Sequence, residues 1–217
     1  MSLVYIFATC FEKPLHSDIF SEYLSVLPIE VQEKNLRYIR WQNKHSHLFG
    51  RLLLIEALKK YNYVNNIWDY IAYNSYERPY FIYDQLDFNI SHSGKYVICA
   101  IGENIRLGVD IEENNNINLK DFYNIMSPDQ WRRINNTDYP LKEFYKYWTI
   151  KESVIKADGR GFSLPIDTLD IINDTVECDN KLWFIREMEF GDGYSLALAT
   201  SREVDYEIIW MNFSKIT

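Results

Sequence analysis

"LDFNISHSGKYVICAIGENIRLGVDIEE", from Leu86 to Glu113, carries the clearest strand signals in the chain. Within it, "KYVICAI" (Lys95–Ile101) is a continuous apolar run of the kind found in buried strands. "IRLGVDIE" (Ile105–Glu112) alternates apolar and other residues with a period of two, and the intervening "GEN" has turn chemistry. The pattern predicts a β-hairpin over this stretch.

The sequence before this stretch predicts one strand and then helices. A first strand is expected near Val4–Thr9 because its residues alternate. Residues 29–61 lack Pro and carry a single Gly. Apolar residues there recur at spacings of three and four, as in an amphipathic helix, so one or two helices are predicted.

The sequence after this stretch predicts further helices and then strands. Ser127 has the chemistry of a helix N-cap, and Pro128 suits the first helical position. A second helix is predicted from Leu141 to Ala157, with Gly159 just past its end. Beyond Leu164 come four short strand-like runs, "TLDII", "KLWFIREM", "YSLALAT" and "YEIIWMNF", which favour an antiparallel sheet.

The two halves of the chain are therefore both predicted to contain helices and strands. We predict an α+β fold of two similar fused halves, related by a pseudo-two-fold axis, with the active site in the cleft between them. The expected boundaries are an N-terminal half over residues 1–112, a linker over 113–118 and a C-terminal half over 119–217. The linker "ENNNIN" is polar and rich in Asn.

Composition narrows the classes of function. The 217 residues are 47% hydrophobic, enough for a sizeable core, and the formal net charge is -8. That charge repels nucleic acid and anionic membranes, so neither is an expected partner. No apolar stretch approaches the length of a membrane span, and the three cysteines form no C-x-x-C pair. These features predict a soluble, cytoplasmic protein.

Asp110 and Glu112 form the first candidate site. They are two residues apart in an expected strand, so their carboxylates leave the same face. Oxygen-only ligands suit Mg²⁺, whereas zinc sites use His and Cys. An isolated D-x-E of this kind is also common on the solvated face of a half-buried strand.

Two further motifs carry polar chemistry. Glu152 and Lys156 are neighbours on one face of the predicted helix, one turn after Trp148, although the same spacing also gives ordinary surface ion pairs. "NISHSG", which includes Ser91 and His92, offers hydroxyls, an imidazole and free backbone N–H groups. Such a turn can cradle phosphate or can simply close a hairpin.

Together, "FNISHSG" (Phe88–Gly94), "GVDIE" (Gly108–Glu112) and "FYKYWTIKESVIKADGRGFSLP" (Phe144–Pro165) resemble the 4′-phosphopantetheinyl transferases. The resemblance is to the pseudo-dimeric group that acts on peptide and polyketide synthase carrier proteins. It spans nearly the whole chain, with weaker similarity in the first helix and at "YERP". It implies an enzyme that moves the phosphopantetheine arm of coenzyme A to a carrier serine, with Mg²⁺, releasing adenosine 3′,5′-bisphosphate.

The resemblance also implies roles for particular residues. Asp110, Glu112 and Glu152 would hold the magnesium ion, and Asp110, Glu152 and Lys156 would form the catalytic set. The serine proton would pass to Glu152 or to a metal-bound water. Coenzyme A would be the co-substrate and an acyl or peptidyl carrier protein the partner of a monomeric enzyme. The residues implied to contact coenzyme A are Ser91, His92, Lys95, Arg78, Lys151 and Lys34, with Arg37 and His45 as weaker candidates.

The sequence departs from the family pattern at two places. Gln130 stands where some members carry a glutamate proposed as the base, and a glutamine cannot accept that proton. Ser46 and His47 stand where members often have an arginine and a small hydroxyl residue for the nucleotide, so Lys44 or Arg51 would have to supply the charge. Docking of an acidic carrier would use local basic clusters and the apolar residues Phe122, Tyr123, Ile125, Met126 and Trp131, which could equally fill a core.

Two other functions remain compatible with the sequence. Gln130 and the altered first helix would also suit a module that binds coenzyme A without turnover. A metal-dependent phosphohydrolase could use the same carboxylates, releasing phosphate without an acceptor protein.

Overall fold

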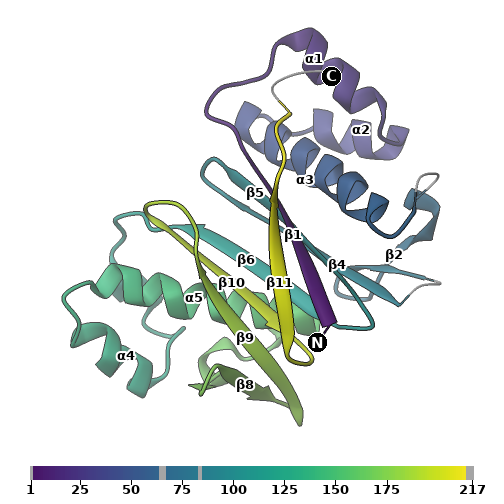
Figure 1. Ribbon diagram of the computed structural model, residues 1–217. Coiled ribbons are helices and arrows are strands. Elements are labelled where there is room, and N and C mark those ends of the chain that lie inside the picture. The colour runs from purple at the N-terminus through teal and green to yellow at the C-terminus, as the bar shows by residue number, and fades with distance from the viewer. Residues whose placement is uncertain (1, 64–66, 83–84, 214–217) are drawn as a thin grey trace.

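The computed structural model describes residues 2–63, 67–82 and 85–213 (Figure 1). The α-helices are α1 (Ser17–Ser25), α2 (Ile29–Leu36), α3 (Trp41–Lys59), α4 (Pro128–Asn135) and α5 (Pro140–Asp158). The strands are β1 (Ser2–Cys10), β2 (Ile71–Tyr73), β3 (Pro79–Phe81), β4 (Leu86–Ser93), β5 (Tyr96–Glu103), β6 (Leu107–Glu113), β7 (Ile171–Ile172), β8 (Thr175–Cys178), β9 (Lys181–Glu189), β10 (Tyr194–Thr200) and β11 (Val204–Trp210).

Two sheets pack face to face, and each carries a long helix on its outer face (Figure 1). The first sheet has the strand order β11-β1-β5-β4 and the second β6-β10-β9-β8-β7. Side chains such as Ile6 and Ile98 of the first sheet meet Val109 and Leu198 of the second in a shared core. The predicted α+β fold of two halves is confirmed.

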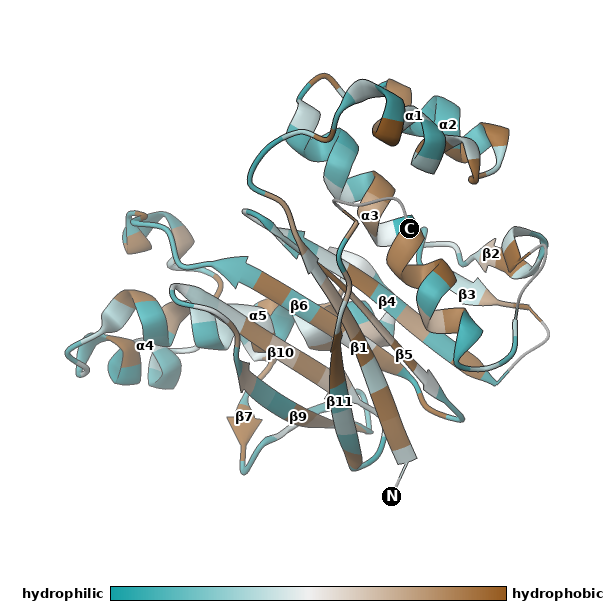
Figure 2. Cartoon of the chain, turned by 45° about the horizontal axis from the view of Figure 1, so that its top comes forward, coloured by the Kyte–Doolittle hydropathy of each residue, from teal (hydrophilic) through white to brown (hydrophobic). Residues whose placement is uncertain are grey.

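Helices α3 and α5 close the outer faces. Residues such as Leu53 of α3 pack on Phe7 and Phe88 of the first sheet, and Ile150 and Val154 of α5 face the second. Figure 2 shows hydrophobic residues along the central strands, while α4 is mostly hydrophilic. No helix in the described part of the chain is long and apolar enough to cross a membrane.

Strand pairing differs from the prediction between Lys95 and Glu112. β5 pairs with β1 and β4, whereas β6 pairs with β10, so the predicted β5–β6 hairpin is wrong. The true hairpin joins β4 to β5, with Gly94 at a φ of 52° in its turn. The alternation of apolar residues predicts which face of a strand is buried, but it does not predict which other strand pairs with it. The connection over residues 103–107 therefore leads β6 into the other sheet without changing the pattern.

The last strand also crosses between the halves. β11 was expected in the C-terminal sheet, but it pairs in parallel with β1, Ser2 opposite Val204. β6, which lies inside the predicted N-terminal segment 1–112, pairs with β10 in the second sheet. The division at 113–118 stays a prediction, and these pairings interlock the two parts of the chain.

A ladder of side chains joins β4 to β6 where the two sheets meet. Four alternate polar side chains of β4 accept hydrogen bonds from alternate backbone N–H groups of β6, which satisfies donors that have no strand partner on that side. The pairs are Asp87 with Leu107 (2.9 Å), Asn89 with Val109 (3.0 Å), Ser91 with Ile111 (3.3 Å) and Ser93 with Glu113 (3.0 Å). The ladder sets β6 in register with β4.

Gly108 lets β6 touch helix α5. A Cβ atom at this position would lie 2.2 Å from the Ser153 carbonyl oxygen and 2.4 Å from the Ala157 nitrogen. Both are backbone atoms that cannot turn aside, so only glycine permits this approach. The strand and the helix therefore present their polar residues to each other at short range.

The predicted helix starts and ends are confirmed. Ser127 caps α4 and forms a capping box with Gln130, and Pro128 is the first helical residue. Gly159 ends α5 in the left-handed conformation, with a φ of 87°.

Candidate active site

Acidic residues of β6 and one face of α5 meet at the seam between the sheets. Asp110 is 2% exposed, whereas Glu112 is only half-buried nearer the strand end. Trp148, Glu152 and Lys156 follow one another by single turns along α5. Strand and helix thus bring together side chains that are far apart in sequence.

Lys156 bridges the two halves of the fold. Its ammonium donates to Asp110 Oδ1 at 2.6 Å and to Ser91 Oγ at 2.9 Å. The Ser91 hydroxyl in turn donates to Asp110 Oδ1 at 2.9 Å. The ammonium thus contacts both sheets, because Ser91 comes from β4 and Asp110 from β6.

Glu112 is held by two donors. Ser93 Oγ donates to Glu112 Oε2 at 2.9 Å, and the Trp148 indole N–H donates to Oε1 at 3.4 Å. Ser93 also accepts from the Glu113 backbone, so the ladder that aligns β6 orients this carboxylate as well. Ser93 was not predicted, although it shares a strand face with Ser91 two residues earlier.

The site holds more negative than positive charge. Burial, together with the nearby Asp110 and Glu112, raises the pKa of Glu152 to about 7 against the opposing effect of Lys156. Burial raises the pKa of Asp110 against the opposing effect of Lys156, and burial together with Asp110 raises that of Glu112. Lys156 acts on all three carboxylates, and Asp110 Oδ2 is buried with no hydrogen-bond partner among the described residues.

The donor chemistry fits a hard cation. All three acidic side chains offer oxygen, and an unpartnered buried oxygen beside a shortage of positive charge is a suitable ligand for one. As the side chains stand, no group of three His, Cys, Asp or Glu residues within 2–63, 67–82 and 85–213 is close enough together to hold a metal ion.

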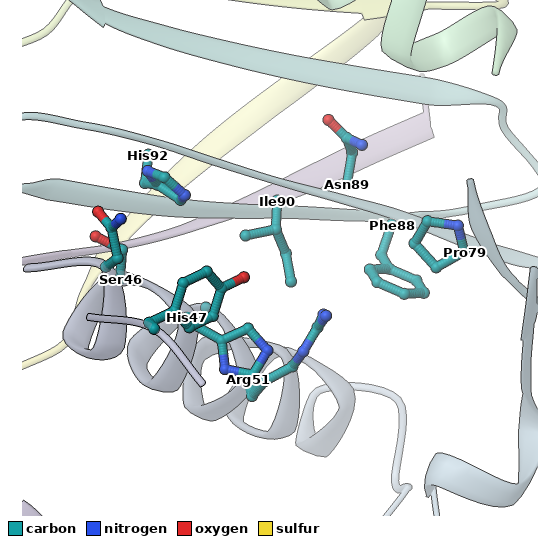
Figure 3. Close-up of a pocket in the computed structure, with 11 residues that line it drawn as sticks. Ser46, His47, Arg51, Pro79, Phe88, Asn89, Ile90 and His92 are labelled. Atoms are coloured by element: carbon teal, nitrogen blue, oxygen red, sulfur yellow. The ribbon is translucent and has the colours of Figure 1, made fainter. Parts of the chain in front are cut away.

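A pocket of about 350 Å³ opens between α3 and β4, next to this cluster (Figure 3). His92 of β4 lines the pocket, and partial burial and Lys156 both lower its pKa. Ser91, its neighbour in sequence, binds Lys156 on the other face of the strand. The residues lining the pocket are Tyr38, Asn43, Ser46, His47, Gly50, Arg51, Pro79, Phe88, Asn89, Ile90 and His92.

Two residues predicted to contact coenzyme A are buried in other roles. Lys151 is fully buried, and its ammonium donates to the carbonyl oxygens of Ile125 and Ile166, each at 2.8 Å. Arg78 is 6% exposed and forms an ion pair with Asp87 at 2.7 Å. The structure does not support a coenzyme contact for either, because their donors are already engaged inside the protein.

The other coenzyme candidates lie at the surface or in the core. Lys95 forms an exposed ion pair with Glu12 at 2.8 Å and does not line the pocket. Lys34 lies in α2 and helps to lower the pKa of His47, so it lies near the pocket. His45 is 4% exposed among aromatic rings, where its Nε2 accepts from the Leu15 backbone, so it serves the core.

Gln130 has a structural role. It is 4% exposed, its side-chain oxygen accepts from the Ser127 backbone, and its amide donates to the Leu169 carbonyl oxygen at 2.9 Å. Of the apolar residues considered for carrier docking, Met126 and Trp131 are buried, whereas Tyr123 is 70% exposed and stacks on Trp131.

Sequence comparisons identify the family. Residues 13–104 match the profile "4′-phosphopantetheinyl transferase, N-terminal", and residues 106–198 match "4′-phosphopantetheinyl transferase superfamily". The chain is 27% identical over 207 residues to the 4′-phosphopantetheinyl transferase Sfp of Bacillus subtilis, covering 90% of this chain and 92% of that protein.

Two other relatives match over shorter stretches. One is the 4′-phosphopantetheinyl transferase gsp of Aneurinibacillus migulanus, 32% identical over 69% of this chain and 63% of its own. The other is a mouse L-aminoadipate-semialdehyde dehydrogenase-phosphopantetheinyl transferase, 28% identical over 68% of this chain and 53% of its own. With the two profile matches covering most of its length, the chain belongs to the 4′-phosphopantetheinyl transferase superfamily of enzymes.

Proposed function

We propose that the protein transfers the 4′-phosphopantetheine arm of coenzyme A to a serine of an acyl or peptidyl carrier protein. The observation that carries the proposal is the meeting of Asp110, Glu112 and Glu152 around Lys156, beside a pocket of about 350 Å³. Phosphoryl transfer asks a protein mainly for cations and for positioning around the phosphate oxygens. The names of the relatives support the same activity.

We propose that Asp110, Glu112 and Glu152 hold Mg²⁺. The support is their oxygen-only chemistry, their raised pKa values and the unpartnered Asp110 Oδ2. When bound, Mg²⁺ would supply positive charge to the diphosphate of coenzyme A. It would also relieve the repulsion among the three carboxylates.

The reaction moves one phosphoryl group. The serine oxygen of the carrier forms a bond to the phosphorus that carries the pantetheine arm, and the bond from that phosphorus to the bridging oxygen breaks. Adenosine 3′,5′-bisphosphate leaves with the electron pair. Lys156 donates to the phosphate oxygens, whose negative charge it stabilises, and Glu152 accepts the serine proton.

We place the reaction in the cytoplasm, supported by the free thiols Cys10, Cys99 and Cys178. We propose that a monomer suffices, because one chain supplies both walls of the seam, Ser91 from β4 and Asp110 from β6.

Mass spectrometry of an apo-carrier protein, incubated with coenzyme A, Mg²⁺ and the enzyme, tests the proposal. The expected result is a gain of the phosphopantetheine mass on one carrier serine. A protein that binds coenzyme A and leaves the carrier mass unchanged would be a binding module without turnover. Release of phosphate with no acceptor present would indicate a hydrolase.

A further inference from the structure

Side chains from distant parts of the chain cap the last turn of α5. A helix leaves its final carbonyl oxygens without an intrahelical donor, and in α5 three of them accept from arginines. Arg78 Nε donates to the Lys156 carbonyl oxygen at 2.8 Å. Arg106 donates to the Ala157 oxygen at 2.8 Å and to the Asp158 oxygen at 3.4 Å. Two cations therefore lie where the helix dipole favours positive charge.

Asn74 extends this contact one residue past the helix. Its Nδ2 donates to the Gly159 carbonyl oxygen at 2.9 Å, and its Oδ1 accepts from the Arg78 backbone at 2.9 Å. A Cβ atom on Gly159 would lie 2.5 Å from Arg78 Cδ, 2.8 Å from Arg106 Nη2 and 3.3 Å from Asn74 Nδ2. The three side chains thus close together over the helix end, and we call Asn74, Arg78 and Arg106 the helix clamp.

Arg78 is the buried centre of the helix clamp. Besides the bond to Lys156, its Nη1 donates to the Pro79 carbonyl oxygen at 3.1 Å and to Asp87 Oδ1 at 3.0 Å. Its Nη2 donates to Asp87 Oδ2 at 2.7 Å and to the Leu107 carbonyl oxygen at 2.9 Å. All five N–H donors of the guanidinium group are therefore used. A lysine, with one nitrogen, could not reach these acceptors together.

Lys156 connects the helix clamp to the site of reaction. Arg78 holds its carbonyl oxygen, while its ammonium lies 2.6 Å from Asp110 Oδ1 and 2.9 Å from Ser91 Oγ. The place of the backbone decides where the ammonium can reach. We propose that the helix clamp positions Lys156 for phosphoryl transfer, and that Arg78 acts through Lys156 without touching coenzyme A. The inference rests on the proposed function and names residues that set its rate.

Arg78→Lys distinguishes this role from a coenzyme contact. The family carries a basic residue at this place for the nucleotide, and a lysine would preserve the charge that such a contact needs. The same lysine would lose the forked geometry by which Arg78 holds the Lys156 carbonyl oxygen, Asp87 and Leu107 together. The two roles therefore predict opposite results for one substitution.

Steady-state carrier loading by the whole enzyme is the first measurement. In Arg78→Lys the kcat, corrected for the folded fraction, should fall about tenfold to a hundredfold, because a small displacement of a catalytic group has effects of this size. The KM for coenzyme A should change by less than about threefold. Arg186→Lys, in an exposed ion pair with Glu203 at 3.6 Å, is the matched control and should change neither.

The second measurement separates positioning from a general loss of structure. Arg78→Lys is combined with Lys156→Ala, and single-turnover loading is followed by mass spectrometry. With no ammonium left to position, the added Arg78→Lys should have no further effect on the rate. A merely structural role would lower the rate by the same factor in both backgrounds, and that result would overturn the inference.

Arg106→Met keeps the test valid if the buried variant misfolds. The Arg106 side chain is 36% exposed, and the change removes two bonds to the helix end while Arg78 and Asp87 stay paired. The kcat should fall about threefold to tenfold with the KM for coenzyme A unchanged. Wild-type kcat in every folded variant, or a raised KM with an unchanged kcat in Arg78→Lys, would overturn the inference.

The inference and the proposed function can fail separately. Normal carrier loading by the wild type, with normal kcat in the Arg78 and Arg106 variants, would overturn the inference alone. A wild type that modified no carrier protein would overturn both.

Discussion

Lys156 and Asp110 lie 46 residues apart in sequence, yet the Lys156 ammonium lies 2.6 Å from Asp110 Oδ1. This contact joins α5 to β6 at the point where Gly108 lets the helix and the strand touch. The acidic cluster therefore depends on backbone approach as much as on the ionisable side chains.

Glu152→Gln should stabilise the protein without Mg²⁺ and abolish transfer. At pH 8 Glu152 is ionised against its raised pKa of about 7, and neutralising it should raise the free energy of unfolding by about 1–3 kcal/mol. Urea unfolding and carrier loading measure the two effects. Glu143→Gln, on the first turn of α5, is the control and should change neither by much. A loss of stability in Glu152→Gln would contradict the predicted repulsion.

Gly108→Ala should destabilise the fold and misplace the acidic residues of β6. The added Cβ would lie 2.2 Å from the Ser153 carbonyl oxygen, so β6 and α5 must move apart, at a cost of about 3 kcal/mol in unfolding free energy. Carrier-loading activity should fall by a larger factor than the fraction of folded protein, which urea unfolding measures. Wild-type activity in this variant would mean that the close approach is not needed.

Lys151→Met should lower stability but leave coenzyme binding intact. Removing the ammonium leaves the Ile125 and Ile166 carbonyl oxygens without their buried donor, which should cost about 2–4 kcal/mol of unfolding free energy. The KM for coenzyme A, measured on the folded fraction, should not change. Lys142→Met on the same helix is the surface control, and a raised KM in Lys151→Met alone would restore the coenzyme contact implied by the family pattern.

The histidine beside the pocket should make the fold sensitive to mild acid. The pKa of His47 is about 4 in the folded chain and about 6.5 in the unfolded one, so the unfolded state binds more protons between these values. The contribution of neutral His47 to the free energy of unfolding is fully present above pH 6.5 and is lost as the pH falls toward 4. Unfolding free energies should fall more steeply over this range in the wild type than in His47→Gln, by about 2–3 kcal/mol at pH 4. If the unfolding free energies of the wild type and of His47→Gln fell in parallel with pH, the lowered pKa of His47 would be contradicted.

Local patterns predicted the elements of this fold well. Ser127 with Pro128 predicted the start of α4, and Gly159 predicted the end of α5, because caps depend on neighbouring residues in sequence. The meeting of Asp110, Glu152 and Lys156 was predicted from the family resemblance.

Tertiary partners were harder to predict. The alternation in β6 could not show that the strand pairs with β10 instead of β5, since both arrangements bury the same face. Helical spacing placed Lys151 on a different face of α5 from Glu152 and Lys156. It could not show that the Lys151 side chain is buried inside the protein. The pocket needs α3, β3 and β4 together, and only Arg51, His92 and the Ser46–His47 departure indicated it from sequence.

The central claim is that Asp110, Glu112 and Glu152 together hold a divalent cation that transfer requires. Its most direct test is a Mg²⁺ titration of chelator-treated enzyme, with carrier loading followed by mass spectrometry in the wild type and in Asp110→Asn. We predict no loading without Mg²⁺, saturable recovery in the wild type and none in Asp110→Asn at the same concentrations. Full loading by the metal-free wild type, or equal recovery in Asp110→Asn, would contradict the claim.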